Sequence, residues 1–245
     1  MRTLTYFISD VHLGLDVADP AARERRLVDF LKGIPAEKTA TLYLLGDIWD
    51  FWYEYRDVVP KGYVRVLSAL LDLMDRGVRV CFFEGNHDIW TYHYFEELGM
   101  ERRTQPYALT IGARRFVIGH GDGLGPGMWG YKLMRWGFHN RVLQALFSTL
   151  HPSLAFSLGK GWSRKSRLSR REEYHFRGTD EPIWKFCDRY NRQHADAPAD
   201  YFIFGHYHCR VDLPVGKARL LMLKDWMDRS NWIRYDAGSD TLEVF

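Results

Sequence analysis

Residues 4–12 have the sequence LTYFISDVH, in which a short run of β-branched and aromatic residues ends at Asp10 and His12. The same arrangement returns at residues 41–47, TLYLLGD, where the run ends at Gly46-Asp47. A continuous apolar run of this length is typical of a strand that is covered on both faces. We therefore expect buried strands that carry polar side chains at their ends.

Three more segments follow this pattern further along the chain. Residues 78–83 precede Gly85-Asn86-His87-Asp88, residues 115–118 precede Gly119-His120, and residues 201–204 precede Gly205-His206-Tyr207-His208. Helices are expected from Asp19-Pro20 to Gly33, over 60–76 and over 180–194, because apolar residues recur there at helical spacing between capping signals. Strands near 219–223, 232–235 and 241–245 complete the pattern, and the fold class is α/β.

The alternation of strands and helices stops between about Gly123 and Arg177. Apolar residues from Trp129 to Leu150 follow a helical stripe with an expected break at Gly137, and residues 162–176 are rich in Arg and Lys. We expect residues 1–245 to form a single domain that carries residues 123–177 as a helical insertion. The alternative is a helical hairpin whose apolar face simply packs on the body.

The composition excludes several classes of protein. The 245 residues are 46% hydrophobic and 27% charged, which is typical of a globular chain and not of a disordered, collagen-like or coiled-coil one. No run approaches the roughly 18 apolar residues that span a bilayer, and the N-terminal apolar segment is too short for a signal peptide. Three scattered cysteines predict no disulfide framework and favour a reducing compartment. We expect a soluble protein, or at most a peripheral one.

The net charge of +3 conceals an uneven distribution. Residues 123–177 contain ten Lys or Arg and two Glu, a net charge of +8, so the rest of the chain carries a net charge of −5. A basic, aromatic-rich insertion over an acidic body fits an amphiphilic, anionic ligand better than a neutral solute.

Seven nitrogen and oxygen donors follow the apolar runs. They are Asp10, His12, Asp47, Asn86, His120, His206 and His208. In an open α/β sheet the carboxyl ends of the strands meet at a crevice, and such a donor set is what two divalent ions about 3.5–4 Å apart require. The donors include no thiolate, so Mn, Fe and Zn all match. Any one of these motifs alone is more often a turn or a cap, whereas the five in order favour a metal site.

The five histidines outside these motifs are expected to lie on the surface or to contribute to packing. They are His93, His139, His151, His175 and His194.

The five motifs, in this order and spacing, resemble those of the calcineurin-like metallophosphoesterases. The resemblance implies a four-layer αββα sandwich with two metal ions. It places Asp10, His12, Asp47 and His208 around one ion, and Asn86, His120 and His206 around a second ion bridged by Asp47. It also implies that a metal-bridging hydroxide attacks phosphorus. His87 is the candidate catalytic residue, for stabilising the transition state or protonating the leaving group, and the alternative for it is an orienting role near Asp88.

Within that superfamily, the segment GDIWDFW (46–52), the insertion and Lys224-Asp225-Trp226 resemble the UDP-2,3-diacylglucosamine hydrolases. These enzymes cleave the pyrophosphate of that nucleotide-linked glycolipid to UMP and 2,3-diacylglucosamine 1-phosphate in lipid A synthesis, usually with Mn²⁺. The resemblance implies that the insertion is a lid for the acyl chains and that the protein lies peripherally on the cytoplasmic face of the inner membrane. The best-known members carry Arg where this chain has His87.

The candidate substrate contacts lie in the metal motifs and in the basic part of the insertion. They are Asn86, His87, Ser163, Arg164, Lys165, Arg167, Arg171 and His206. The basic side chains are expected to meet the diphosphate or anionic lipid headgroups.

Two other functions stay open at this point. One is a different dinuclear metallophosphoesterase, such as a phosphomonoesterase, a nucleotide-lipid phosphodiesterase or a nuclease. The other is a non-catalytic module that docks on membranes or partners, against which the intact set of seven donors argues. No protein partner is evident, and nucleic acid is not the expected ligand.

Overall fold

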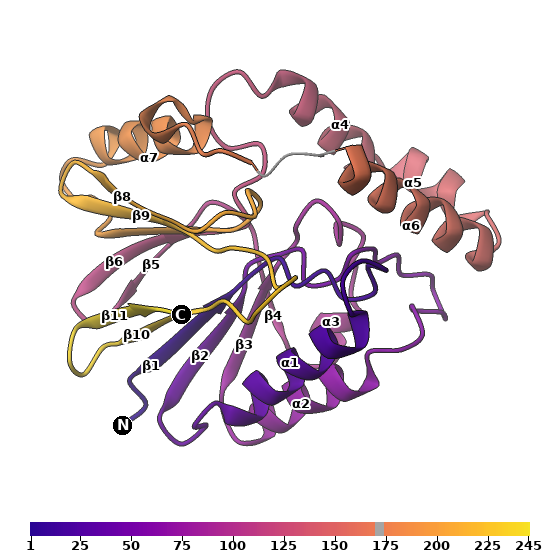
Figure 1. Ribbon diagram of the computed structural model, residues 1–245, viewed down its shortest axis with the longest axis horizontal. Helices are drawn as coiled ribbons and strands as arrows, with labels where there is room; N and C mark the ends of the chain where they lie inside the picture. Colours follow the sequence, from indigo (N-terminus) through magenta and orange to yellow (C-terminus); the bar gives the residue numbers. More distant parts are fainter. Residues whose placement is uncertain (170–173) are drawn as a thin grey trace.

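Two β-sheets form the centre of the computed structural model, which describes residues 1–169 and 174–245 except for the side chains of 165–169 (Figure 1). The first sheet has the order β11-β10-β1-β2-β3-β4 and the second the order β5-β6-β7-β9-β8. The first contains β1 (Leu4–Ile8), β2 (Thr39–Leu44), β3 (Arg79–Phe83), β4 (Glu101–Arg103), β10 (Ile233–Asp236) and β11 (Thr241–Val244). The second contains β5 (Tyr107–Ile111), β6 (Arg114–Ile118), β7 (Tyr201–Phe204), β8 (Val211–Val215) and β9 (Ala218–Met222).

The two sheets pack face to face, and helices cover their outer faces. Between the sheets, the ring of Phe7 on β1 stacks on Phe116 of β6 at a centroid distance of 5.9 Å. The helices α1 (Pro20–Gly33) and α2 (Val64–Asp75) pack on the outer face of the first sheet. Helix α7 (Pro182–Gln193) packs on the second sheet through Ile183 and Cys187. The expected four-layer α/β sandwich is confirmed.

Strands β1 to β4 are parallel, as are β6, β7 and β9. Each parallel set therefore ends at the same edge of its sheet, and this edge is where the polar motifs were expected. The expected runs at 4–8, 41–45, 78–83, 115–118 and 201–204 all contain strands.

The second expected helix, over 60–76, begins only at Val64. Gly62 and Tyr63 have φ angles of 102° and 59°, and this left-handed backbone prevents a helix from starting earlier. Three strands were missed because they lie at sheet edges and lack a continuous apolar run. The strand β4 is polar and three residues long, β5 alternates half-buried and exposed residues, and β8 contains Asp212 and Pro214.

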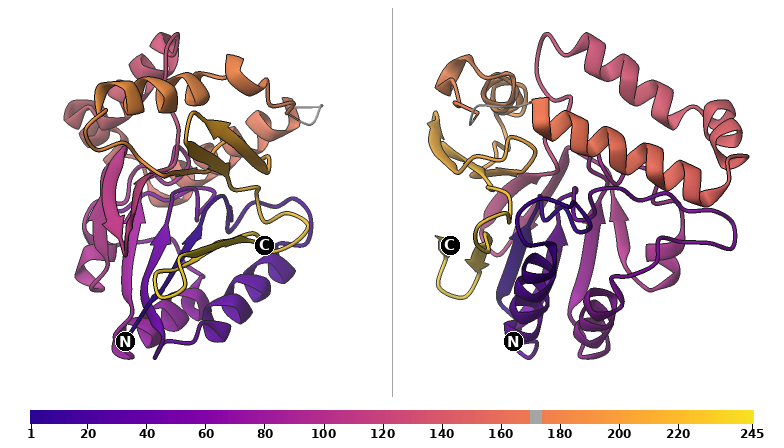
Figure 2. Two further views of the ribbon diagram at one scale, coloured as in Figure 1. Left: turned by 90° about the vertical axis from the view of Figure 1, so that its left-hand side faces the viewer. Right: turned by 45° about the vertical axis from the view of Figure 1, so that its right-hand side comes forward.

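The insertion forms a layer of helices over the carboxyl ends of β1, β2 and β3 (Figure 2). It contains α4 (Trp129–His139), α5 (Arg141–Ser148) and α6 (Pro152–Ser169), and the short helices α3 (Tyr94–Glu97) and η1 (Gly178–Asp180) lie outside it. The expected break at Gly137 is wrong, because the chain turns at Asn140. The Asn140 side chain accepts hydrogen bonds from the amides of Val142 and Leu143 at 3.0 and 3.1 Å and so caps α5.

No helix in the part of the chain that the structure describes is both long enough and apolar enough to cross a bilayer. The single-domain assignment and the bounds 123–177 of the insertion stay predictions.

Candidate metal centre and adjoining cavity

The seven predicted donors lie on the loops that follow β1, β2, β3, β6 and β7. Five of them have left-handed backbone, namely Asp10, His12, Asp47, His206 and His208, with φ between 50° and 71°. Each such residue costs about 1–3 kcal/mol, and such strain gathers at functional sites. The sharp turns direct side chains from separate strands toward one point.

Asp10, His12, Asp47 and His208 form the first cluster, and their ligand atoms all lie within 4.8 Å of one another. The Nε2 atom of His12 lies 3.7 Å from both Asp10 Oδ1 and Asp47 Oδ2, and His208 Nε2 lies 3.5 Å from Asp10 Oδ1. Among the described residues, these two buried carboxylate oxygens have no hydrogen-bond donor. A buried oxygen without a partner is costly, and a cation at this point would satisfy both.

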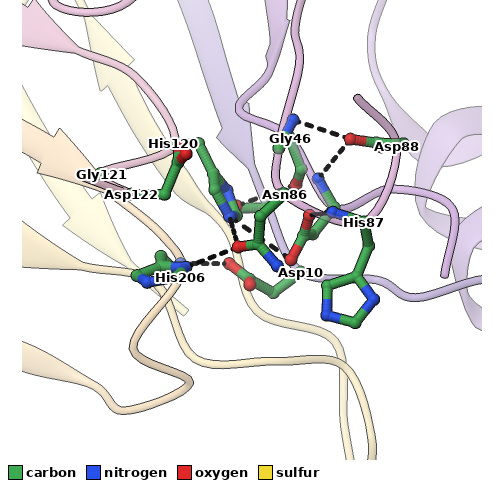
Figure 3. A network of polar contacts seen from close by, with 12 residues as sticks. Asp10, Gly46, Asn86, His87, Asp88, His120, Gly121, Asp122 and His206 are labelled. Carbon is green, nitrogen blue, oxygen red and sulfur yellow. Dashed lines mark hydrogen bonds and ion pairs between the residues drawn. The ribbon is translucent and has the colours of Figure 1, made fainter. Parts of the chain in front are cut away.

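Asn86, His120 and His206 form a second cluster (Figure 3). The Oδ1 atom of Asn86 lies 3.2 Å from His120 Nε2 and 2.8 Å from His206 Nδ1, and His120 Nε2 lies 3.4 Å from Asp47 Oδ2. His120 Nδ1 donates a hydrogen bond to the Leu45 carbonyl at 3.0 Å. This hydrogen bond leaves the Nε2 lone pair for a metal ion.

The electrostatics of both clusters favour a bound cation. Burial alone would lower the pKa of His120, but Asp47 and Asp10 together raise it to about 10. Burial would likewise raise the pKa of Asp47, but His120 and His87 hold it well below its usual value. The buried carboxylates thus keep a proton on a histidine, and a divalent ion can take the place of that proton.

Two glycines allow the carboxylates of Asp47 and Asp10 to lie close to the backbone of neighbouring loops. A Cβ atom on Gly85 would lie 2.1 Å from Asp47 Oδ1, and one on Gly205 would lie 2.1 Å from Asp10 Oδ2. The Asp88 carboxylate joins the loop after β3 to the loop after β2. It accepts hydrogen bonds from the backbone amides of Gly85, Asp47, Ile48 and Trp49 at 2.7–3.3 Å. The donors, oxygen and imidazole nitrogen without a thiolate, fit Mn, Fe or Zn.

Three buried carboxylates at this site were missed by the sequence reasoning. Asp225 Oδ2 lies 3.0 Å from His208 Nδ1, and Asp50 Oδ1 lies 3.3 Å from His12 Nδ1. Both orient a histidine through its second nitrogen. Asp122 lies two residues after His120 in the same loop. Asp50 lies in the segment 46–52 and Asp225 in the segment 224–226, both of which the sequence had singled out. A carboxylate in such a segment does not by itself identify the histidine that it contacts.

A cavity of 770 Å³ adjoins the candidate metal centre and extends between the helices of the insertion. Asn86, His87 and His206 line its polar end. Its apolar walls include Phe51, Trp90, Met134, Phe138, Leu143, Phe147, Leu158 and Trp162. A largely apolar cavity with a few polar groups suits an amphiphilic ligand.

The structure places the predicted substrate contacts in three groups. Asn86, His87, His206 and Ser163 line the cavity, and the Ser163 hydroxyl donates to Asp50 Oδ1 at 2.7 Å. Arg164 is exposed on α6. The side chains of Lys165 and Arg167, and the whole of Arg171, lie outside the described residues. The five histidines expected on the surface are all exposed.

The family model for the calcineurin-like phosphoesterases matches residues 4–210 of this chain. The chain belongs to that family. A UDP-2,3-diacylglucosamine hydrolase of Porphyromonas gingivalis is 34% identical over 99% of this chain and 98% of its own length. A UDP-2,3-diacylglucosamine hydrolase of Yersinia pseudotuberculosis is 29% identical over 98% of each chain.

An archaeal phosphodiesterase of known structure covers 99% of this chain and 98% of its own at 13% identity and a TM-score of 0.47, a likeness too low to support an inference about function. Family membership confirms the predicted resemblance to the calcineurin-like enzymes. Together with the clustered donors, it identifies the protein as a metal-dependent hydrolase.

Proposed function

We propose that this protein hydrolyses the pyrophosphate bond of UDP-2,3-diacylglucosamine and releases UMP and 2,3-diacylglucosamine 1-phosphate, a step of lipid A synthesis. The full-length likeness to two hydrolases of that name supports the substrate. The observation that carries the proposal is the apolar cavity of 770 Å³ that begins at Asn86, His87 and His206. It offers space for acyl chains next to the proposed metal ligands.

In the proposed mechanism, Asp10, His12, Asp47 and His208 would hold one divalent ion, and Asp47, Asn86, His120 and His206 would hold a second. Two Mn²⁺ ions, or Fe or Zn in their place, would lower the pKa of a water and neutralise charge on the phosphoryl oxygens. The His87 ring lines the cavity, and its Nδ1 atom donates to the Asp50 carbonyl at 3.0 Å. Its Nε2 atom is therefore the one that faces the phosphoryl group, and it can protonate the leaving group only from the imidazolium form, in which both ring nitrogens carry a proton.

The direct test incubates purified protein and Mn²⁺ with UDP-2,3-diacylglucosamine or with UDP-glucosamine that lacks acyl chains. We expect UMP release from the diacyl form to be faster by about a hundredfold in kcat/KM, because binding energy from the chains reaches the transition state. Equal rates would remove the acyl-binding part of the proposal. Cleavage of bis-p-nitrophenyl phosphate without UMP release from either nucleotide would leave a phosphoesterase with another substrate.

We also propose that the protein acts at the cytoplasmic face of the inner membrane. Trp129, Leu133 and Trp136 on α4 are 82%, 68% and 64% exposed, and the insertion that carries them has a net charge of +8. Exposed apolar residues beside basic ones suit an anionic lipid surface.

The membrane proposal is tested by flotation with phosphatidylglycerol-containing vesicles. Trp129→Glu with Trp136→Glu should reduce binding at least about tenfold, since two exposed indole rings that would enter the lipid surface are lost. Val58→Glu, at an exposed apolar position on the body, should bind like the wild type. Equal binding by all three proteins would contradict docking through α4.

A further inference from the structure

Helix α4 is held in place without a buried side chain. All of its residues lie within the described range, and none of them is buried. Nevertheless, it forms one wall of the cavity through Tyr131, Met134 and Phe138. Its aromatic packing is concentrated in the last turn, where the half-buried Phe138 ring lies 5.1 Å from the Trp90 ring and 5.4 Å from the Trp162 ring. Polar contacts supply much of the restraint on the first two turns.

Those contacts converge on Asp122, whose side chain is fully buried. Its Oδ2 atom accepts hydrogen bonds from the Tyr131 hydroxyl at 2.6 Å and from Arg135 Nη1 at 2.5 Å. Its Oδ1 atom accepts from Gln105 Nε2 at 2.5 Å, and Gln105 Oε1 accepts from the amide of Gly121 at 2.6 Å. One carboxylate thus joins α4 to the loop that carries His120.

Tyr131 and Arg135 are four residues apart and lie on the same face of α4. The Tyr131 ring lies 6.0 Å from the His206 ring and lines the cavity. A Cβ atom on Gly123 would lie 3.0 Å from the Tyr131 ring, so the loop after Asp122 also approaches this side chain closely. The position of Tyr131 beside the candidate metal centre therefore depends on the contacts made by Asp122.

We propose that Asp122 is a positioning residue that locks α4 onto the loop of His120 and so sets the cavity wall beside His206. Arg135 forms an ion pair with the buried Asp122 carboxylate, and removal of either residue leaves the other without this opposite charge in a low-dielectric environment. The remaining anchors lie at the far end of the helix, where Trp90 Nε1 donates to the Phe138 carbonyl at 3.0 Å and His139 contacts Glu84 at 3.3 Å. They do not restrain the first two turns.

The first test measures hydrogen exchange of the α4 amides in the full-length protein. Asp122→Asn keeps the size of the side chain but cannot accept both hydrogen bonds on its amide side, and Arg135→Met keeps the length of the side chain without the charge. We expect about tenfold faster exchange over 129–139 in each variant. The double variant should match the more affected single one, because both remove the same contact. Lys132→Met, at an exposed position on the same helix, is the matched control.

The second test is kinetic and rests on the proposed function. Arg135→Met should raise KM for UDP-2,3-diacylglucosamine about tenfold, with kcat and the hydrolysis of bis-p-nitrophenyl phosphate within about twofold of wild type. Bis-p-nitrophenyl phosphate does not reach the insertion, so its hydrolysis does not depend on the position of α4. A merely structural defect would lower both activities together.

The outcomes separate the two proposals. Wild-type exchange over α4 in both Asp122→Asn and Arg135→Met would overturn the role of Asp122, as would an equal loss of activity on both substrates in Arg135→Met. If Asp122→Asn fails to fold, Arg135→Met decides, because Arg135 is 25% exposed and tolerates a neutral replacement more readily. If the wild type releases no UMP, the proposed substrate is wrong while the exchange measurement still decides the role of Asp122.

Discussion

At the scale of single residues, one carboxylate joins the two clusters of the candidate metal centre. The Oδ2 atom of Asp47 lies 3.7 Å from His12 Nε2 and 3.4 Å from His120 Nε2, and it has no hydrogen-bond donor among the described residues. No other proposed ligand contacts a histidine of each cluster through one atom in this way within the described chain. Asp47 is therefore the residue on which a two-metal mechanism depends most.

Asp47→Ala should lower metal-dependent hydrolysis by about a thousandfold or more, because neither ion retains its shared ligand. The measurement is the rate of UMP release at saturating Mn²⁺. Asp57→Ala, an exposed carboxylate ten residues further along, serves as the control and should keep wild-type activity. Full activity in Asp47→Ala would contradict the dinuclear centre.

A second prediction at this scale concerns Asp225, which orients His208 through Nδ1 at 3.0 Å. Asp225→Asn should weaken Mn²⁺ binding by about ten- to a hundredfold, the usual cost of losing a partner behind a metal-binding histidine. Competition with a metal-sensitive dye measures the affinity. Asp228→Asn, at an exposed site three residues away, should bind like the wild type. Unchanged affinity in Asp225→Asn would show that His208 needs no such partner.

At the scale of elements, α6 approaches the body closely at a glycine. A Cβ atom on Gly159 would lie 2.2 Å from the Phe51 ring, whereas one on Gly161, in the same helix, would meet nothing within 4 Å. The Phe51 ring is buried and lines the cavity. The distance between α6 and the cavity floor therefore depends on the missing side chain of Gly159.

Gly159→Ala should displace α6 and raise KM for the diacyl substrate about tenfold, with little change in hydrolysis of bis-p-nitrophenyl phosphate. Gly161→Ala should leave KM unchanged and stabilise the helix by up to about 1 kcal/mol, since alanine is the better helix former. Steady-state kinetics and thermal unfolding of the pair provide the comparison. Equal KM values in the two variants would refute the close approach.

At the scale of the whole molecule, the proposed ligands connect the two sheets. Asp10, Asp47 and Asn86 follow strands of the first sheet, and His120 and His206 follow strands of the second. A metal ion bound by residues from both sheets stabilises the folded state only, since the unfolded chain does not present the site.

Mn²⁺ at a hundred times its Kd should add about 2.7 kcal/mol to the free energy of unfolding. For a chain of this length that corresponds to a rise in Tm of roughly 5–11 °C, and EDTA should reverse it. Differential scanning calorimetry measures the shift, with Asp10→Ala as the variant that should lose it. A rise of the same size in Asp10→Ala would place the stabilising ion elsewhere.

The sequence alone determines the α/β fold class and the residues of the candidate metal centre. Both follow from local chemistry, because a continuous apolar run predicts a buried strand and a polar motif directly after it must lie at the strand end. The strands β4, β5 and β8 could not be found in this way, because none of them contains a continuous apolar run. Likewise, the turn at Asn140 depends on a hydrogen bond that Gly137 cannot make.

Only the tertiary structure decides which carboxylates support that centre and how the insertion meets it. Asp50 contacts Ser163 across 113 positions of sequence, and Asp122 joins the loop of His120 to α4. Such pairings depend on the packing of segments that are distant in the chain, and an isolated Asp in the sequence does not reveal its partner. The charge contrast between an acidic body and a basic insertion is a property of the sequence, whereas the cavity between them exists only once the chain has folded.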